Sequence, residues 1–268
     1  MRYILKGNFN PINNKQLVYI NQIKKENKID EIYLFNDGEN RLFDVSIKEY
    51  DSLYKISEED IEDYDEINII PDIYFIDYAD GDFREFSTKV IEYIFENVDI
   101  LTEVPRRLLS ENRFKHSVSV AKTAVNISEC NNINVHEAYI AGLLHDICKE
   151  MDHDIELEWI VKYFPQYSKI NRKIFHQFTA YIFIKDYMKY NNVNVLDAIL
   201  HHVLGSSMKP LGMTLYIADK IEPLRGYNTE KEVQLYKKSL ESCFKVVKAT
   251  QAKYYEKELK NDKKRVNN

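Results

Sequence analysis

A histidine and an aspartate, His145 and Asp146, are adjacent in the sequence and could do chemistry together. They lie in the stretch 143–149, which reads LLHDICK. An imidazole and a carboxylate are costly to place at the end of an apolar helix unless something binds them. Because both groups are good ligands for divalent cations, the pair is typical of half a metal site.

Three further residues could complete such a site. His116 lies upstream of the pair, and His202 and Asp219 lie well downstream. A lone buried histidine is more often a hydrogen-bonded core residue than a ligand, and an aspartate can instead pair with a neighbouring cation. Each of these residues nevertheless has apolar neighbours at helical spacing. We therefore expect them to face a shared interior site.

Helices are expected to position these residues. Helical patterning extends from about residue 108 to residue 259, with proline only at 165, 210 and 223. The expected features are an apolar stripe at Val118, Ala121 and Val125 after His116, a helix at 138–149, a long charged helix at 229–259 and a frayed tail at 260–268.

The spacing around the histidine pair His201-His202 distinguishes the two rings. Val195, Ile199 and His202 are four and then three residues apart and so share one helical face. His201 is rotated by about 100° from that face. We expect His202 to point inward as a ligand and His201 to lie at the rim. Asp219 likewise follows an apolar residue at a spacing of four and is expected to face inward.

The first hundred or so residues are typical of an α/β fold. The expected strands are Tyr3–Leu5, Ile32–Phe35, Ile67–Ile70 and Ile73–Ile76, and the expected helices are Asn14–Lys25 and Phe86–Glu96. The first strand, helix and second strand predict a parallel βαβ unit. The strongly acidic stretch Asp44–Glu66 is interpreted as a solvated connection rather than a binding tail.

Composition excludes several classes of protein. The 268 residues are 44% hydrophobic with a net charge of −6, which argues against nucleic-acid binding. Three cysteines without CxxC spacing do not predict a disulfide framework. There is no apolar run of membrane-spanning length and no apolar leader at the N-terminus, so we expect a soluble, cytoplasmic protein with no membrane partner.

The order His, His-Asp, Asp resembles the ligand pattern of HD-domain metal-dependent phosphohydrolases. The segments that carry the resemblance are Arg113–Ser117, Ala141–Lys149, Ala198–His202 and Tyr216–Arg225. Over roughly residues 108–228 they are similar to the YqeK family, the bacterial symmetrical diadenosine-tetraphosphate hydrolases of the HD type. Val203 departs from that family, which usually has threonine there.

The resemblance implies two metal ions, commonly iron, although the same ligands also suit Mn, Co or Zn. The implied ligands are His116, His145, Asp146, His176, His202 and Asp219. Asp146 would bridge the metals, and Asp146, His145 and Lys149 would carry the catalysis. The implied reaction converts diadenosine tetraphosphate into two ADP. A dinucleoside polyphosphate substrate also needs basic residues besides the metals, and Lys149 is a candidate because it lies one helical turn from His145. The further candidates for substrate binding are Arg113, His201, Lys220 and Arg225, and the alternative for each cation is a solvated surface charge.

The stretch 7–16, GNFNPINNKQ, resembles the phosphate-binding turn of nicotinate-nucleotide adenylyltransferases, Gly-x-Phe-x-Pro-x-His-x-Gly-His. Asn13 and Gln16 replace its two histidines. The stretch 86–91 similarly resembles that family's Ser-Ser-Thr-x-Ile-Arg, with Ile91 in place of the arginine. We interpret residues 1–105 as a degenerate, shortened nucleotidyltransferase-like α/β domain of Rossmann type, followed by an all-α HD domain at 106–268.

Three alternatives remain open from the sequence. The chain could be another HD nucleotide phosphohydrolase, acting on nucleoside triphosphates, cyclic nucleotides or alarmones. It could be a bifunctional enzyme that retains adenylyltransferase activity, which Asn13 and Gln16 argue against because an amide cannot carry the charge of an imidazolium. The N-terminal region could also serve as a docking or dimerisation scaffold, which would make the protein a homodimer.

Overall fold

The computed structural model describes residues 3–61 and 67–266. The described chain folds into two compact units. One contains the residues up to Arg107 together with Asp186–Tyr190, and the other contains Leu108–Lys185 and the residues from Asn191 onward. Among the helices of the described ranges, none is both long and apolar enough to cross a membrane.

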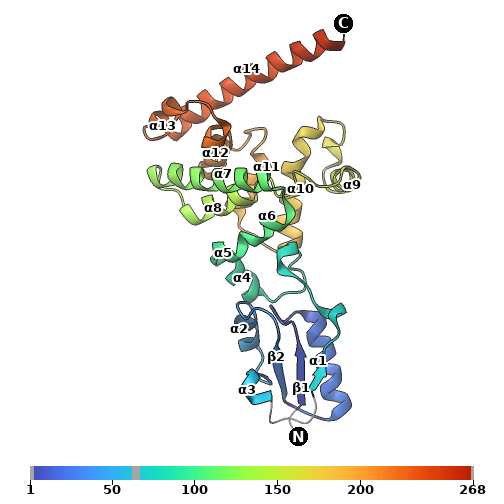
Figure 1. Cartoon of the computed structure of the whole chain (residues 1–268). Helices are drawn as coiled ribbons and strands as arrows, with labels where there is room; N and C mark the ends of the chain where they lie inside the picture. Colours follow the sequence, from blue (N-terminus) through green and yellow to red (C-terminus); the bar gives the residue numbers. More distant parts are fainter. Residues whose placement is uncertain (1–2, 62–66, 267–268) are drawn as a thin grey trace. The chain divides into compact units, whose positions relative to one another are not determined.

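A parallel β-sheet forms the centre of the first unit (Figure 1). Its strands are β1 (Tyr3–Gly7), β2 (Ile32–Asn36), β3 (Leu53–Lys55) and β4 (Ile67–Ile69), in the order β3-β2-β1-β4. The helix α1 (Asn14–Asn27) connects β1 to β2, which run parallel, so the predicted βαβ unit is confirmed. Leu5, Ile20 and Leu34 are among the residues of the apolar core between sheet and helix.

Two expectations for this unit are wrong. The acidic stretch Asp44–Glu66 is more than a connection, because it contains β3 together with most of α2 (Phe43–Ser46), η1 (Ile47–Glu49) and α3 (Glu58–Ile61). Only Leu53 of β3 is buried, so the strand has no apolar alternation to reveal it; residues 62–66 lie outside the described residues. The expected strand Ile73–Ile76 overlaps a short 3₁₀ helix, η2 (Asp72–Tyr74), in which Ile73 is 78% exposed.

Helices complete the first unit. The expected helix at 86–96 is α4 (Thr88–Glu96), and the shorter elements around it are η3 (Tyr78–Asp80), α5 (Val98–Leu101) and α6 (Glu103–Leu108). The segment Asp186–Tyr190 returns to this unit, where the Tyr187 carbonyl accepts a hydrogen bond from the Phe83 N–H at 2.9 Å. The ring of Tyr190 stacks on Phe95 with centroids 3.9 Å apart.

The described part of the second unit is helical, as the sequence predicts (Figure 1). Its main helices are α7 (Glu111–Cys130), α8 (Val135–Leu144), α9 (His153–Tyr163), α10 (Phe175–Ile182), α11 (Val193–His201), α12 (Pro210–Ile221), α13 (Glu230–Tyr236) and α14 (Leu240–Val266). Shorter turns of helix are η4 (Pro165–Tyr167), η5 (Arg172–Ile174) and η7 (Pro223–Arg225), and the π-helical turn η6 (Phe183–Tyr187) begins in this unit with Phe183–Lys185.

The helix boundaries differ from the sequence expectations in several places. The helix expected at 138–149 ends at Leu144, and the following residues form tight turns. The helix expected at 229–259 is interrupted between Tyr236 and Leu240. Where a frayed tail was expected from residue 260, the backbone is helical to Val266; residues 267–268 lie outside the described ranges.

The buried face of α7 is also rotated from the expected one. Val120, Ala121, Ala124 and Ile127 are completely buried, whereas Val118 and Val125 are only half-buried. This face packs against α8. The sequence thus predicted the helix correctly but did not predict which of its faces is buried.

Candidate metal centre

His145 follows the last residue of α8 and is completely buried. Its Nδ1 lies 2.7 Å from the carbonyl oxygen of Gly142, so we assign the ring proton to Nδ1 and the lone pair to Nε2. Nε2 is buried and has no hydrogen-bond partner among the described residues. An unpartnered buried lone pair is costly unless a cation binds it.

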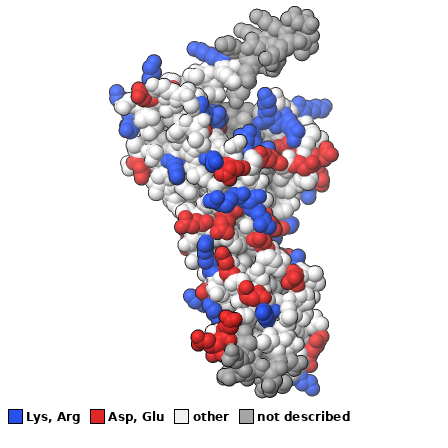
Figure 2. Space-filling model, viewed as in Figure 1, with Lys and Arg blue, Asp and Glu red and all other residues white. Residues whose placement is uncertain are grey.

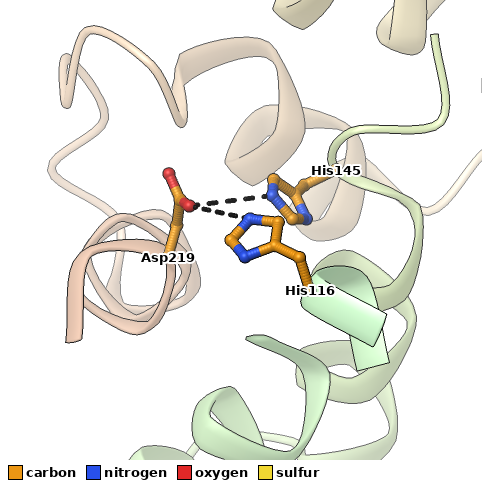
Figure 3. Close-up of side chains that lie close together, drawn as sticks. All are labelled: His116, His145 and Asp219. Atoms are coloured by element: carbon orange, nitrogen blue, oxygen red, sulfur yellow. Dashed lines mark ion pairs between the residues drawn. The ribbon is translucent and has the colours of Figure 1, made fainter. Parts of the chain in front are cut away.

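Two residues from other helices face this nitrogen (Figure 3). His116 comes from α7 and Asp219 from α12. Asp219 Oδ1 lies 3.2 Å from His116 Nε2 and 3.9 Å from His145 Nε2. Each of the three residues offers one ligand atom, and these atoms all lie within 4.8 Å of one another. This spacing of imidazole and carboxylate groups suits a divalent metal ion.

Asp146 lies between this group and a second one. Its Oδ2 is 3.7 Å from His145 Nε2 and 3.9 Å from His116 Nε2. Its Oδ1 is 3.1 Å from His176 Nε2 and 3.6 Å from His202 Nε2. His176 is the second residue of α10, and His202 directly follows α11. The two oxygens of one carboxylate therefore face two different pairs of histidines.

Hydrogen bonds from outside the site orient two more of the rings. His202 Nδ1 lies 2.7 Å from the carbonyl oxygen of Ile199, and His116 Nδ1 lies 3.0 Å from Glu222 Oε1. Both contacts direct Nε2 toward the candidate site. Burial lowers the pKa of His116, but Asp219 and Glu222 outweigh burial and raise it above 6.5. Sequence reasoning did not assign this role to Glu222, a buried carboxylate just after α12.

The electrostatics favour ligands that are ready to bind a cation. Burial raises the pKa values of Asp146 and Asp219, but neighbouring imidazoles and cations outweigh burial and hold both values well below 3.8. Burial lowers the pKa of His145 to about 4, and it also lowers the pKa values of His176 and His202. At neutral pH these carboxylates are ionised and these three imidazoles are neutral, as metal binding requires.

The two groups open into a cavity of about 800 Å³. Its charged lining residues are the basic Arg113, Lys149, Arg172, Lys173, Lys220 and Arg225 and the acidic Asp146, Glu156 and Asp219. Basic side chains thus outnumber carboxylates here, although the whole chain has a net charge of −6. On the face drawn in Figure 2, acidic and basic side chains are interspersed. A locally basic cavity in an acidic chain suits an anionic ligand.

Four of the expected substrate contacts line this cavity, namely Arg113, Lys149, Lys220 and Arg225. Lys149 Nζ lies 2.9 Å from His176 Nε2. His201 is not among the lining residues, and its Nδ1 instead lies 2.7 Å from Ser206 Oγ. Sequence reasoning missed two basic residues of the lining, Arg172 and Lys173, which belong to no motif.

Residues 113–224 match the family model of the HD domain. This segment contains all the candidate ligands described above. It is an HD domain. Its ends lie in α7 and in η7, so the HD domain takes in the helices that carry His116 and Asp219.

Curated proteins resemble part of the chain as well. The chain is 29% identical over 172 residues to the "Probable nicotinate-nucleotide adenylyltransferase/Ap4A hydrolase" of Mycoplasma pneumoniae, a match that covers 61% of this chain and 50% of that protein. It is 29% identical over 133 residues to the "Bis(5'-nucleosyl)-tetraphosphatase, symmetrical" of Staphylococcus aureus, covering 48% of this chain and 68% of that protein. The match thus spans half the length of the Mycoplasma relative.

A solved structure is similar to the chain as well. It is the crystal structure of a "predicted HD superfamily hydrolase involved in NAD metabolism" from Clostridium acetobutylicum. The TM-score is 0.53 at 25% sequence identity, and the match covers 60% of this chain and 88% of that one. Sequence and structure therefore agree on an HD fold.

Proposed function

We propose that the chain is a metal-dependent hydrolase that cleaves diadenosine tetraphosphate symmetrically into two ADP. The position of Asp146 supports this most directly, because its two oxygens face separate pairs of histidines. A carboxylate in such a position can bridge two metal ions a few Å apart. The hydrolase names of the relatives agree with the proposal.

Six side chains would hold the two metal ions. His116, His145 and Asp219 would bind one ion, His176 and His202 the other, and Asp146 both. The unpartnered Nε2 of His145 and the ionised carboxylates fit a cation at this place. We propose iron, and the same donors suit Mn, Co or Zn. Divalent ions held by these residues would supply Lewis acidity, which would make a water molecule more acidic and offset negative charge on the attacked phosphoryl group.

The basic residues of the chain would bind and orient the phosphates. Arg113 and Arg225 lie beside Asp146 and Asp219, where guanidinium groups can bind phosphate oxygens in pairs. The reaction adds one water molecule across the central P–O–P linkage. The oxygen of the water forms a new bond to one of the two central phosphorus atoms, and the bond from that atom to the bridging oxygen breaks. The bridging oxygen leaves with the second ADP, and the proton lost by the water passes to this oxygen or to solvent. Lys149 Nζ, on the His176 side, is suited to stabilise the negative oxygen of the departing ADP.

We interpret the first unit as a degenerate nucleotidyltransferase-like domain ending near residue 105. Asn13 and Gln16 form a capping box at the start of α1. Asn13 Nδ2 also donates to the Tyr74 carbonyl at 2.8 Å, and Gln16 Nε2 donates to the Asn8 carbonyl at 2.6 Å. All four polar atoms of the two side chains therefore serve the fold, which argues against phosphate binding by this turn.

Product analysis tests the proposed reaction. The purified chain would be incubated with diadenosine tetraphosphate and Fe²⁺ or Mn²⁺, and the nucleotides would be separated by chromatography. We expect ADP as the sole product, with no turnover in chelator or in the Asp146→Ala variant. ATP with AMP would show cleavage at another linkage. If the protein holds two metal ions and still does not turn over diadenosine tetraphosphate, this result would contradict the proposed substrate and favour another nucleotide.

A further inference from the structure

A second group of basic residues lines the cavity on the His176 side. Arg172 and Lys173 belong to η5, the short helix that leads directly into α10. They precede His176 by four and three residues, and both line the cavity. The position of α10, which places His176, therefore also places these two cations near the candidate centre.

The other basic residues of the cavity are bound to the candidate metal ligands. Arg113 Nη1 is 3.6 Å from Asp146 Oδ2, and Arg225 Nη2 donates to Asp219 Oδ1 at 2.7 Å. Both contacts lie on the side of Asp146 that faces His116. The cavity thus has basic residues on both sides of Asp146.

Arg172 is held in place by a buried carboxylate. Its Nε donates to Glu156 Oε2 at 3.0 Å, and Glu156 belongs to α9. The Glu156 side chain is only 6% exposed, whereas the Arg172 side chain is 53% exposed. A buried carboxylate is costly without a partner, so this contact fixes the arginine. The hydrogen bond to Glu156 is made by Nε of the guanidinium. The terminal NH₂ groups of an arginine can bind a phosphate through a pair of hydrogen bonds, so this part of Arg172 is suited to a phosphate.

We propose that Arg172 and Lys173 form a second phosphate-binding subsite, which holds the part of a polyphosphate chain that extends to the His176 side of the centre. This inference rests on the proposed function. It gives each half of a symmetrical substrate its own basic residues, Arg113 and Arg225 for one half and Arg172 and Lys173 for the other. Glu156 is then a positioning residue for Arg172.

Steady-state kinetics of the full-length, Mn²⁺-loaded chain test the subsite. Because a charge-assisted hydrogen bond would be lost, Arg172→Ala should raise the KM for diadenosine tetraphosphate about tenfold or more, with kcat little changed. Arg172→Lys should recover part of the loss. Lys169→Ala is the matched control, since Lys169 is exposed nearby and does not line the cavity. An unchanged KM in Arg172→Ala, or an equal rise in Lys169→Ala, would overturn the inference.

Two additions keep the test decisive. Arg172→Ala removes the nearer basic partner of the buried Glu156, whose Oε2 also lies 3.9 Å from His153 Nδ1. Lys173→Ala is therefore measured as well, and thermal unfolding is recorded for every variant. If the wild type hydrolyses no dinucleoside polyphosphate, the proposed function fails while the subsite stays testable through binding of inorganic tripolyphosphate in excess Mn²⁺. We expect its Kd to rise about tenfold in Arg172→Ala and to stay unchanged in Lys169→Ala. Equal Kd values in wild type and Arg172→Ala would contradict the subsite.

Discussion

The backbone of Ala121 in α7 lies so close to Gly142 in α8 that a Cβ atom on Gly142 would stand 2.4 Å from the Ala121 Cα. The absence of a side chain on Gly142 lets the two helices approach this closely about one turn before His145, the residue that follows α8. The carbonyl of the same glycine orients the His145 ring. One glycine therefore sets both the distance between the two helices and the direction of a candidate ligand.

Gly142→Ala should destabilise the protein and weaken metal binding. Alanine favours a helix by about 1 kcal/mol over glycine, but overpacking against a backbone typically costs about 1–3 kcal/mol, and here the clash is with atoms that cannot rotate away. We expect a lower Tm and a weaker metal affinity than in Val135→Ala, a control at the exposed start of α8. A higher Tm in Gly142→Ala would show that the helices can separate without cost.

Glu222→Gln should weaken metal binding while the fold is retained. Glu222 accepts hydrogen bonds from Ser119 Oγ at 2.7 Å and from the Leu224 N–H at 2.7 Å, besides its contact with His116. The amide preserves the shape but removes the charge that orients the His116 ring. Loss of such a partner typically costs about 10–100-fold in metal affinity. Titration of the metal-free chain with Mn²⁺ measures this, with the exposed Glu129→Gln as control; equal affinities would contradict the role of Glu222.

The sequence predicted the parts of this site that depend on local spacing. Helical periodicity separated His202, which is 1% exposed and points inward, from its neighbour His201. Local spacing could not show that the two oxygens of Asp146 face different histidine pairs, because that depends on how four separate segments pack. It also could not reveal the contact between Arg172 of η5 and Glu156 of α9, because neither residue belongs to a motif. β3 was missed because its pattern has only one buried residue.

Asp146→Asn should reduce the number of metal ions bound per chain from two to at most one. The amide keeps one oxygen acceptor but replaces the other oxygen with an NH₂ group that cannot be a ligand, so it cannot serve both pairs of histidines. Metal analysis after dialysis provides the count. His136→Ala removes an exposed histidine at the start of α8 and should leave the count at two. Two retained ions in Asp146→Asn would rule out Asp146 as the bridge.

The first unit should not transfer the adenylyl group of ATP to nicotinate mononucleotide. The polar atoms of Asn13 and Gln16 are already used, because they cap α1 and donate to the carbonyls of Tyr74 and Asn8.

We expect Asn13→Ala to lower the stability of this unit by about 1 kcal/mol, the usual contribution of an N-cap residue, and to leave the hydrolysis of diadenosine tetraphosphate unchanged. The exposed Asn21→Ala, within α1, is the matched control for thermal unfolding. Formation of the dinucleotide by the wild type, lost in Asn13→Ala, would show that this turn still binds nucleotide phosphates.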